Sequence, residues 1–254
     1  MKSYIAFTSK EILESIRSYK AFILIIVFLI LGFMSPITAK LTPEIVKNFM
    51  PEGMSIVITE PTVIDSWMQF FKNVPQIGMI VIVIVFSSLV SGEISKGTLI
   101  NVLTKGLSRQ NVILAKFTCA TLIWTICYYV AFLVVYFYNL LFWTDTGVYN
   151  LFFSVSCVWI FGIFLISTLL LGGVLFKSSY GSLLLTGGLV VIMMFIGMLQ
   201  TIAKFNPMQL MSVNMSLLTG PTTPSDLYIS IIVTVSLTLL SLISSIIIFN
   251  KKQI

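Results

Sequence analysis

The feature that most constrains this chain is a series of six long apolar runs, each long enough to cross a bilayer as a helix. A membrane-spanning helix needs about 20 apolar residues. The runs cover residues 21–39, 74–92, 117–142, 150–175, 181–201 and 227–249. Charged residues are only 9% of the chain and hydrophobic residues are 57%, so too few polar side chains remain to cover a soluble domain. We therefore expect an all-α membrane protein that forms a single transmembrane domain over residues 1–254.

Basic residues are distributed unequally between the two sides of the predicted bundle. Six spans place both termini on one side, together with residues 93–116 and 176–180. That side carries most of the 15 lysines and arginines: Lys2, Lys10, Arg17, Lys20, Lys96, Lys105, Arg109, Lys116, Lys177, Lys251 and Lys252. The other side carries Lys40, Lys47, Lys72 and Lys204. Because segments rich in Lys and Arg stay in the cytoplasm, we expect both termini there. This placement explains the net charge of +6 without a nucleic-acid partner.

Several kinds of chemistry are absent from the sequence. The chain has no histidine, which excludes a catalytic triad and a histidine-based zinc site. Its cysteines, Cys119, Cys127 and Cys157, all fall in apolar runs and are expected to be small buried side chains. The segment from Gly92 to Thr98 has the glycine spacing of a phosphate-binding loop but no Lys after its second glycine. We expect no catalytic residue, no metal site and no cofactor in this chain.

Residues 1–20 are predicted to form an amphipathic helix ahead of the first span. Ile5, Ile12, Ile16 and Tyr19 share a narrow arc at about 100° per residue. Such a helix lies in the headgroup region and bends, as an elbow, into the span that follows. The alternative is an ordinary charged flank from which the first span begins slightly early.

The segment between the second and third runs is predicted to contain a short helix from Ile94 to Thr104. Its apolar stripe consists of Leu99, Ile100, Leu103 and Leu107. Gly106 is placed to end this helix and Ser108 to cap the next one. Because a short helix between two spans has no core of its own, we expect it to lie on the membrane or to dock into a partner.

Two segments on the opposite side are long enough to have structure of their own. Residues 40–73 are expected to be the largest outer loop, in which the aromatic piece Trp67 to Phe71 either packs over the mouth of the bundle or contributes to a ligand site. Residues 202–226 are too short and too interrupted by proline and glycine to cross the bilayer, and too apolar for a free loop. They are expected to form a re-entrant or interfacial segment.

The second and fifth runs contain small or flexible residues that favour a subunit interface lining a translocation route. The candidates on these runs are Ser87, Ser88, Ser91, Met193, Met194 and Met198. Small residues let helices approach closely, and methionine adapts to varied apolar surfaces. Ordinary helix packing within one bundle is the alternative.

The apolar runs contain no acidic or basic residue away from their ends. Ion-coupled secondary transporters usually need such residues to bind or relay the ion. A stand-alone secondary transporter or channel is therefore disfavoured. A third possibility is a non-transporting membrane protein, such as a sensor or an immunity factor, which would not require a docking helix.

The combined pattern of Glu93, Gly97-Thr98, Leu103, Arg109 and Lys116, within this layout of spans, resembles the permeases of the ABC type-2 exporter family. The family often has a proline shortly before the arginine, where this chain has Gly106-Leu107-Ser108. The resemblance covers nearly the whole chain and includes the elbow helix, the six spans, a cytoplasmic coupling helix within residues 93–112 and the outer re-entrant segment.

The resemblance implies a subunit of a larger machine in the cytoplasmic membrane of a bacterium. Two separate ATP-binding-cassette ATPase subunits, which hold ATP and Mg²⁺, would drive two permease chains, the second being identical or homologous to this one. Cargo would move outward and is expected to be amphipathic or hydrophobic, such as a peptide, a lipid or a drug-like molecule. The residues expected at the ATPase docking site are Glu93, Lys96, Gly97, Thr98, Leu99, Leu103, Arg109 and Lys116.

Overall fold

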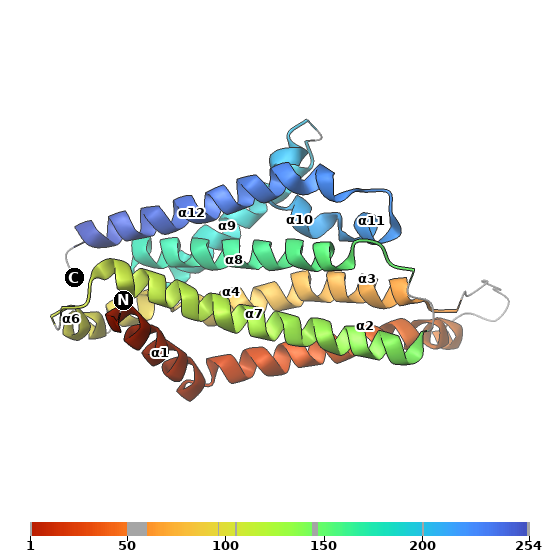
Figure 1. Cartoon of the computed structure of the whole chain (residues 1–254), viewed down its shortest axis with the longest axis horizontal. Coiled ribbons are helices and arrows are strands. Elements are labelled where there is room, and N and C mark those ends of the chain that lie inside the picture. The colour runs from red at the N-terminus through yellow and green to blue at the C-terminus, as the bar shows by residue number, and fades with distance from the viewer. Residues whose placement is uncertain are drawn as a thin grey trace.

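A computed structural model describes residues 2–49, 60–95, 97–104, 106–143, 147–199 and 201–252, and within these ranges the chain is all-helical without strands. Among the described residues, six helical segments are long and apolar enough to cross a membrane, and they lie along the long axis of the molecule (Figure 1). The beginning of α1 and the end of α12 lie at the same end of the bundle, which we call the termini end; the opposite end is the far end.

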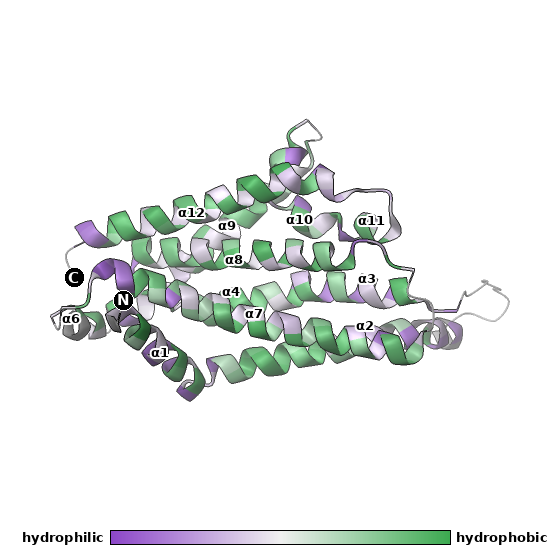
Figure 2. Cartoon of the chain, in the orientation of Figure 1, coloured by the Kyte–Doolittle hydropathy of each residue, from purple (hydrophilic) through white to green (hydrophobic). Residues whose placement is uncertain are grey.

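The elements follow one another in a simple order. They are α1 (Lys2–Arg17), α2 (Lys20–Phe49), α3 (Val63–Asn73), the π-helix η1 (Val74–Gly78), α4 (Met79–Phe86), α5 (Ser91–Ser95), α6 (Thr98–Leu103), α7 (Arg109–Phe142), α8 (Leu151–Phe176), α9 (Ser179–Gly197), the 3₁₀ turn η2 (Ala203–Phe205), α10 (Gln209–Ser212), α11 (Asn214–Thr219), the 3₁₀ turn η3 (Pro224–Leu227) and α12 (Tyr228–Lys251). The candidate spans start at α2, α3, α7, α8, α9 and η3. Hydrophobic residues dominate the middle of the long helices, and hydrophilic residues gather on α1, at the start of α7 and at the end of α12 (Figure 2).

The core of the bundle lies around α8, which is the most buried span, whereas α9 and α12 are the least buried. Helix α8 packs against α7, α9 and α12. Its Gly162 lets the indole of Trp124 approach so closely that an added Cβ would overlap the ring. Trp124 also stacks obliquely on Tyr128, with ring centroids 4.7 Å apart. As expected, Cys119, Cys127 and Cys157 are unpaired and buried.

The second span begins earlier than the hydropathy pattern predicts. Lys72 and Pro75 interrupt the apolar run, but the helix continues through them because the backbone widens into a π-turn at Val74–Gly78, which accommodates the missing proline N–H. Trp67 to Phe71 therefore belongs to the span itself, and Trp67 is only 2% exposed. The outer loop is therefore shorter than the predicted 40–73: α2 continues to Phe49 at one end, and α3 already begins at Val63 at the other.

The segment between α9 and α12 forms short helical turns at the far end of the bundle (Figure 1). Helices α10 and α11 pack against α8 through the buried side chains of Leu210, Leu217 and Leu218. Gly220 ends α11 in a left-handed conformation, with φ 96°. The segment forms only short helical turns between the fifth and sixth candidate spans; its predicted re-entrant or interfacial position in the membrane stays a prediction.

Candidate functional site

Residues from Ile94 to Thr104 do not form the predicted single helix: α5 ends the second span at Ser95, and α6 is a separate short helix in the loop that follows. Gly97 adopts a left-handed backbone with φ 68°, which separates α5 from α6 because a helix cannot continue through that conformation. Gly106 is also left-handed, with φ 88°, and the Ser108 hydroxyl accepts a hydrogen bond from the Asn111 N–H at 3.4 Å. The expected stop at Gly106 and cap at Ser108 are confirmed.

The apolar side of this loop packs onto the chain's own bundle. Leu99 is fully buried, and Leu103 and Leu107 pack against the hydrophobic core. The expectation that this stripe has no core of its own is therefore wrong. Thr98, beside Leu99, is exposed, so a partner would meet the polar side of α6. Lys96 lies outside the described residues.

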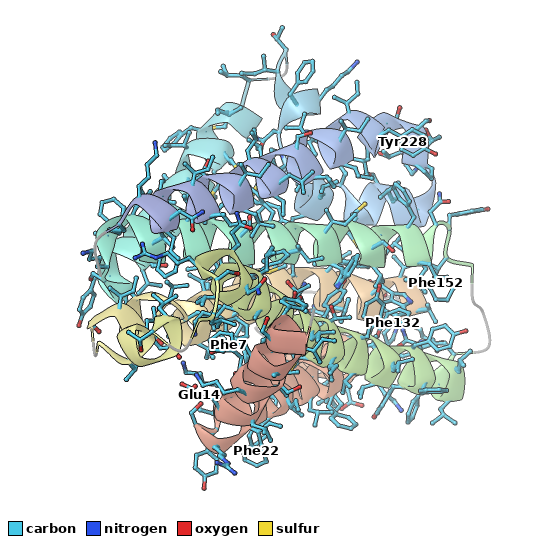
Figure 3. All side chains as sticks on the ribbon, turned by 60° about the vertical axis from the view of Figure 1, so that its left-hand side comes forward. Phe7, Glu14, Phe22, Phe132, Phe152 and Tyr228 are labelled. Carbon is cyan, nitrogen blue, oxygen red and sulfur yellow. The ribbon has the colours of Figure 1, made fainter. Side chains whose placement is uncertain are left out.

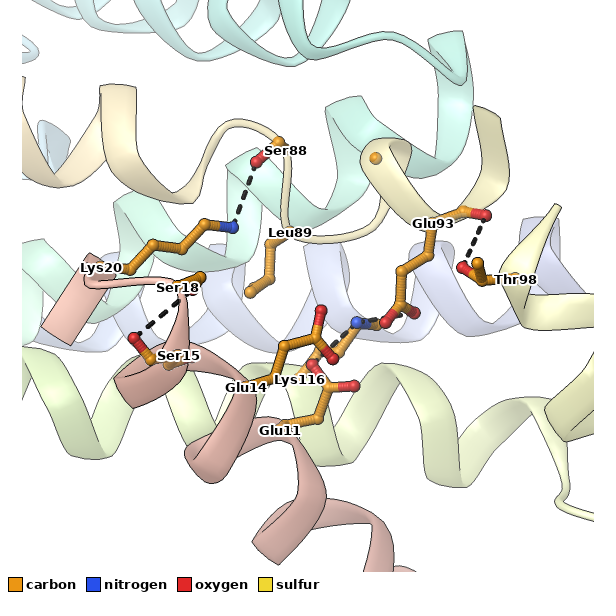
Figure 4. A pocket seen from close by; sticks show the side chains of 11 residues that line it. Glu11, Glu14, Ser15, Ser18, Lys20, Ser88, Leu89, Glu93, Thr98 and Lys116 are labelled. Atoms are coloured by element: carbon orange, nitrogen blue, oxygen red, sulfur yellow. Dashed lines mark hydrogen bonds and ion pairs between the residues drawn. The ribbon is translucent and has the colours of Figure 1, made fainter. Parts of the chain in front are cut away.

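Charged side chains from three separate elements meet at the termini end of the bundle (Figure 4). Lys116 of α7 is 1% exposed, and its Nζ lies 2.8 Å from Oε2 of Glu11 and 2.9 Å from Oε2 of Glu93. Lys10 lies 3.0 Å from Oε1 of Glu11 and 3.0 Å from Oε1 of Glu93, and 2.5 Å from Oε2 of Glu14. We call Lys10, Glu11, Glu14, Glu93 and Lys116 the ion cluster.

The ion cluster connects the elbow helix α1, the helix α5 at the base of the loop, and the start of α7. Removing one member of a buried pair leaves an uncompensated charge, which usually destabilises a protein by about 3–5 kcal/mol. Burial alone would lower the pKa of Lys10, but its contacts with Glu14, Glu11 and Glu93 outweigh this effect and hold the pKa above its ordinary value. Lys10 therefore remains charged throughout the physiological pH range.

The carboxylates of Glu11, Glu14 and Glu93 approach within 4.8 Å of one another, a spacing that also suits a bound cation. Here the ammonium groups of Lys10 and Lys116 lie among these carboxylates. The two lysines thus provide the positive charge that the acidic groups need, and the cluster is best described as an internal ion network.

Arg109 holds a second junction at the same end. Its Nη1 donates hydrogen bonds to the carbonyl oxygens of Phe249 at 2.8 Å and Asn250 at 3.2 Å, and it also bonds the carbonyl of Lys252. Lys252 in turn donates to the carbonyl oxygens of Val174 and Leu175 near the end of α8. The first residue of α7 is thereby tied to the ends of α12 and α8.

The elbow helix forms as predicted, and most of its apolar arc faces away from the bundle. Ile5 and Ile16 are more than half exposed, while Phe7 and Glu11 are buried. Figure 3 shows Phe7 between α1 and the bundle. Tyr19 follows the helix and makes the bend to α2 with φ 59°. Ile12 is the one member of the arc that packs against the core.

The residues predicted to line a translocation route do not gather at one place within the chain. The Ser91 hydroxyl lies 3.1 Å from that of Ser179, which joins the second and fifth spans at the termini end. Ser87 and Met193 are buried, whereas Met194 and Met198 are largely exposed. The remaining candidate, Ser88, accepts a hydrogen bond from Lys20 at 3.3 Å.

Most of the ion cluster is not predictable from the sequence. The sequence pattern indicates Glu93 and Lys116 as contacts with a partner, and it indicates no role for Lys10 or Glu11. One sequence signal is available for Glu11, because it lies four residues after Phe7 and so shares the face of α1 that is buried. No pattern in the sequence predicts that this face meets Lys116, which is 105 residues away.

Comparison with known proteins shows the family to which this chain belongs. The family model for ABC-2 family transporter proteins matches residues 5–253. The uncharacterized transmembrane protein YxlG of Bacillus subtilis (strain 168) is 24% identical over 180 residues, which is 70% of this chain and 70% of that protein. Membership implies a non-catalytic membrane subunit that associates with an ABC ATPase. With its six spans, this chain therefore belongs to the ABC-2 family of transporter membrane proteins as a permease component.

Proposed function

We propose that this chain is the passive membrane half of an ATP-driven exporter and is moved by an ATPase that binds at the termini end. The proposal rests on the ion cluster. In this cluster Glu93 of α5 forms ion pairs with Lys10 of the elbow helix and with the buried Lys116 of α7. A displacement of α5 and α6 is therefore transmitted to α7 through the buried contact with Lys116, and to α1 through the more exposed contact with Lys10.

The proposed docking surface is the polar side of α6 and the turns around it. Thr98 is exposed there, while Leu99 anchors the same helix to the bundle. Glu93 and Arg109 have partners within the chain, so in this proposal they position the loop. The ATPase touches the loop, and these two side chains pass its movement to the spans.

We further propose that the termini end is cytoplasmic and that the membrane is the cytoplasmic membrane of a bacterium. The excess of Lys and Arg on the segments at that end supports this orientation. A cytoplasmic ATPase then has direct access to α6. ATP and Mg²⁺ belong to that partner, and the family's working unit of two permeases and two ATPases is the expected stoichiometry.

The surface of α9 supports a second permease chain as the neighbour in the membrane. This helix is the least buried of the six candidate spans, and an added Cβ at Gly187 or Gly188 would meet nothing within 4 Å. Glycines on an exposed helix face let a second backbone approach closely. Met194 on this helix and Met198 directly after it are also exposed, and they add flexible apolar side chains to the same surface. This surface suits an amphipathic or hydrophobic cargo that moves along the interface of two chains.

The experiment that tests the proposal is co-expression of this chain with each candidate ABC ATPase from the same genome, followed by affinity purification from membranes. The two proteins should co-purify, and the ATP turnover of the complex should depend on an intact α6. If the chain instead catalyses uphill movement of a cargo in vesicles without an ATPase, it is a secondary transporter and the proposal is wrong.

A further inference from the structure

A polar cavity of about 340 Å³ lies beside the ion cluster, between α1, the start of α2 and the end of the second span. Its lining includes Ser18, Lys20, Ser88, Leu89, Glu14 and Glu93. Figure 4 shows Lys20 with Ser88 on one side of it and the carboxylates of the cluster on the other. The cavity therefore has a cationic side and an anionic side.

Lys20 is the basic residue of this cavity that has no ion pair. Within the described part of the chain, no carboxylate lies within 4.0 Å of its Nζ, and its hydrogen bond goes to the Ser88 hydroxyl at 3.3 Å. An ammonium group has three donors, so Lys20 retains donors for an anionic group. Lysine and hydroxyl donors that converge in this way suit the oxygens of a phosphate.

Glu14 provides the opposite side of the cavity. Its side chain is 52% exposed, and Lys10 contacts its Oε2. A carboxylate has about four acceptor positions on its two oxygens, so Glu14 keeps the capacity to accept from a further cationic donor. The cavity thus offers donors for a phosphate and an acceptor for an ammonium group.

The charges of the cavity and the ion cluster select between kinds of ligand. Lys10, Lys20 and Lys116 balance Glu11, Glu14 and Glu93, so the site is neutral as a whole. A zwitterionic ligand leaves this balance unchanged, whereas an anionic one adds an uncompensated charge to a partly buried place. A ligand with both a phosphate and a primary ammonium group matches both sides.

The position of the cavity identifies where such a ligand comes from. Lys20 is the first residue of the first span, and Ser88 lies in the turn between α4 and α5 near the end of the second span. The outward-facing residues Ile5 and Ile16 of α1 suit contact with acyl chains at the same level. These elements border the headgroup region of one leaflet.

We infer that this cavity binds the headgroup of a phosphoethanolamine lipid, with its phosphate at Lys20 and Ser88 and its ammonium group at Glu14. The site uses the chain's own residues and does not depend on docking of an ATPase. Binding would fix the angle between α1 and α2, because Ser18 and Lys20 flank the bend at Tyr19.

The test is competitive lipid binding to the purified full-length chain, measured by native mass spectrometry. The probes are phosphatidylethanolamine, phosphatidylcholine and phosphatidylglycerol with identical acyl chains. Phosphatidylethanolamine should bind most tightly, because choline has no N–H to donate and glycerol leaves the phosphate charge unbalanced. Equal binding of the three lipids would overturn the inference.

Two variants assign the two sides of the site separately. Lys20→Gln should weaken phosphatidylethanolamine binding by about tenfold, as expected for the loss of a charged hydrogen bond, and Lys20→Arg should restore most of it. Glu14→Gln should remove the preference for ethanolamine over choline while leaving choline-lipid binding unchanged. The control is Lys251→Gln, an exposed basic residue at the same end and outside the cavity.

Soluble glycerophosphoethanolamine separates a lipid from a free metabolite. It should compete weakly, because it lacks the acyl chains that α1 contacts. Competition as strong as that of the whole lipid would overturn the assignment to a membrane lipid. Wild-type affinity in Lys20→Gln would overturn the site itself.

Discussion

The Nζ of Lys116 lies 2.8 Å from Oε2 of Glu11, and both side chains are almost completely buried. This pair joins an amphipathic helix outside the bundle to the third span. Because Glu93 completes the arrangement from the second span, three elements that are distant in the sequence are fixed relative to one another at the termini end.

The first prediction concerns the strength of this connection. Lys116→Met leaves Glu11 and Glu93 without their buried partner and should destabilise the protein by about 3–5 kcal/mol. The measurement is thermal unfolding in detergent, followed by intrinsic fluorescence. Lys251→Met, at an exposed position, is the matched control and should unfold like the wild type.

A double variant separates pairing from burial in this cluster. Glu11→Gln with Lys116→Met should be less destabilised than the sum of the single variants, since the two side chains interact directly. Strict additivity would show that the contact between Glu11 and Lys116 contributes nothing specific.

The second prediction concerns the packing of α7 against α8. Gly162→Ala places a methyl group against the indole of Trp124, which is held by a hydrogen bond to the Trp159 carbonyl at 3.1 Å. Overpacking of this kind should destabilise the protein by about 1–3 kcal/mol. Gly173→Ala adds the same group elsewhere on α8, where its nearest neighbours would lie at an ordinary contact distance of 3.5 Å, so its unfolding temperature in detergent should not fall.

The third prediction concerns the break between α5 and α6. Gly97→Ala forces an alanine into a left-handed conformation that costs about 1–2 kcal/mol, so the loop should rearrange toward a continuous helix. The variant should insert into membranes normally but recover less ATPase on co-purification. Gly92→Ala is the control, because its Cβ would make only an ordinary contact, 3.5 Å from Ser88. Equal recovery with both variants would contradict a role for this break.

The fourth prediction concerns the clamp made by Arg109. Arg109→Ala removes the bonds to the carbonyl groups at the end of α12. In a reconstituted complex it should uncouple ATP turnover from export, and Glu93→Ala should do the same through the ion cluster. The measurement is the ratio of cargo moved to ATP hydrolysed. Normal ratios in both variants would show that neither side chain transmits movement.

The features that the sequence predicted well are local ones. Gly106 and Ser108 end one helix and begin the next because their backbone and hydroxyl chemistry acts within a few residues. The spans are predictable for the same reason, since each depends on its own apolar content. The exception is the start of the second span, where Lys72 and Pro75 resemble a boundary but the helix continues through a π-turn.

The features that escaped prediction depend on which helix faces join. The amphipathic character of α1 is evident from its sequence, but an arc of isoleucines does not indicate whether it faces lipid or protein. Ile5 and Ile16 are exposed, and the face that carries Glu11 is buried instead. The stripe that includes Leu99 posed the same ambiguity, and it packs on the chain's own core.

The most direct test of the central claim is site-specific photo-cross-linking from α6 in native membranes. A photoreactive residue at Thr98, which is exposed beside the buried Leu99, should cross-link to the ABC ATPase. The same residue at Ser225, which is exposed in η3 just before α12 begins, should not. A cross-link to the ATPase from Ser225, or none from Thr98 in a complex that co-purifies, would contradict the account.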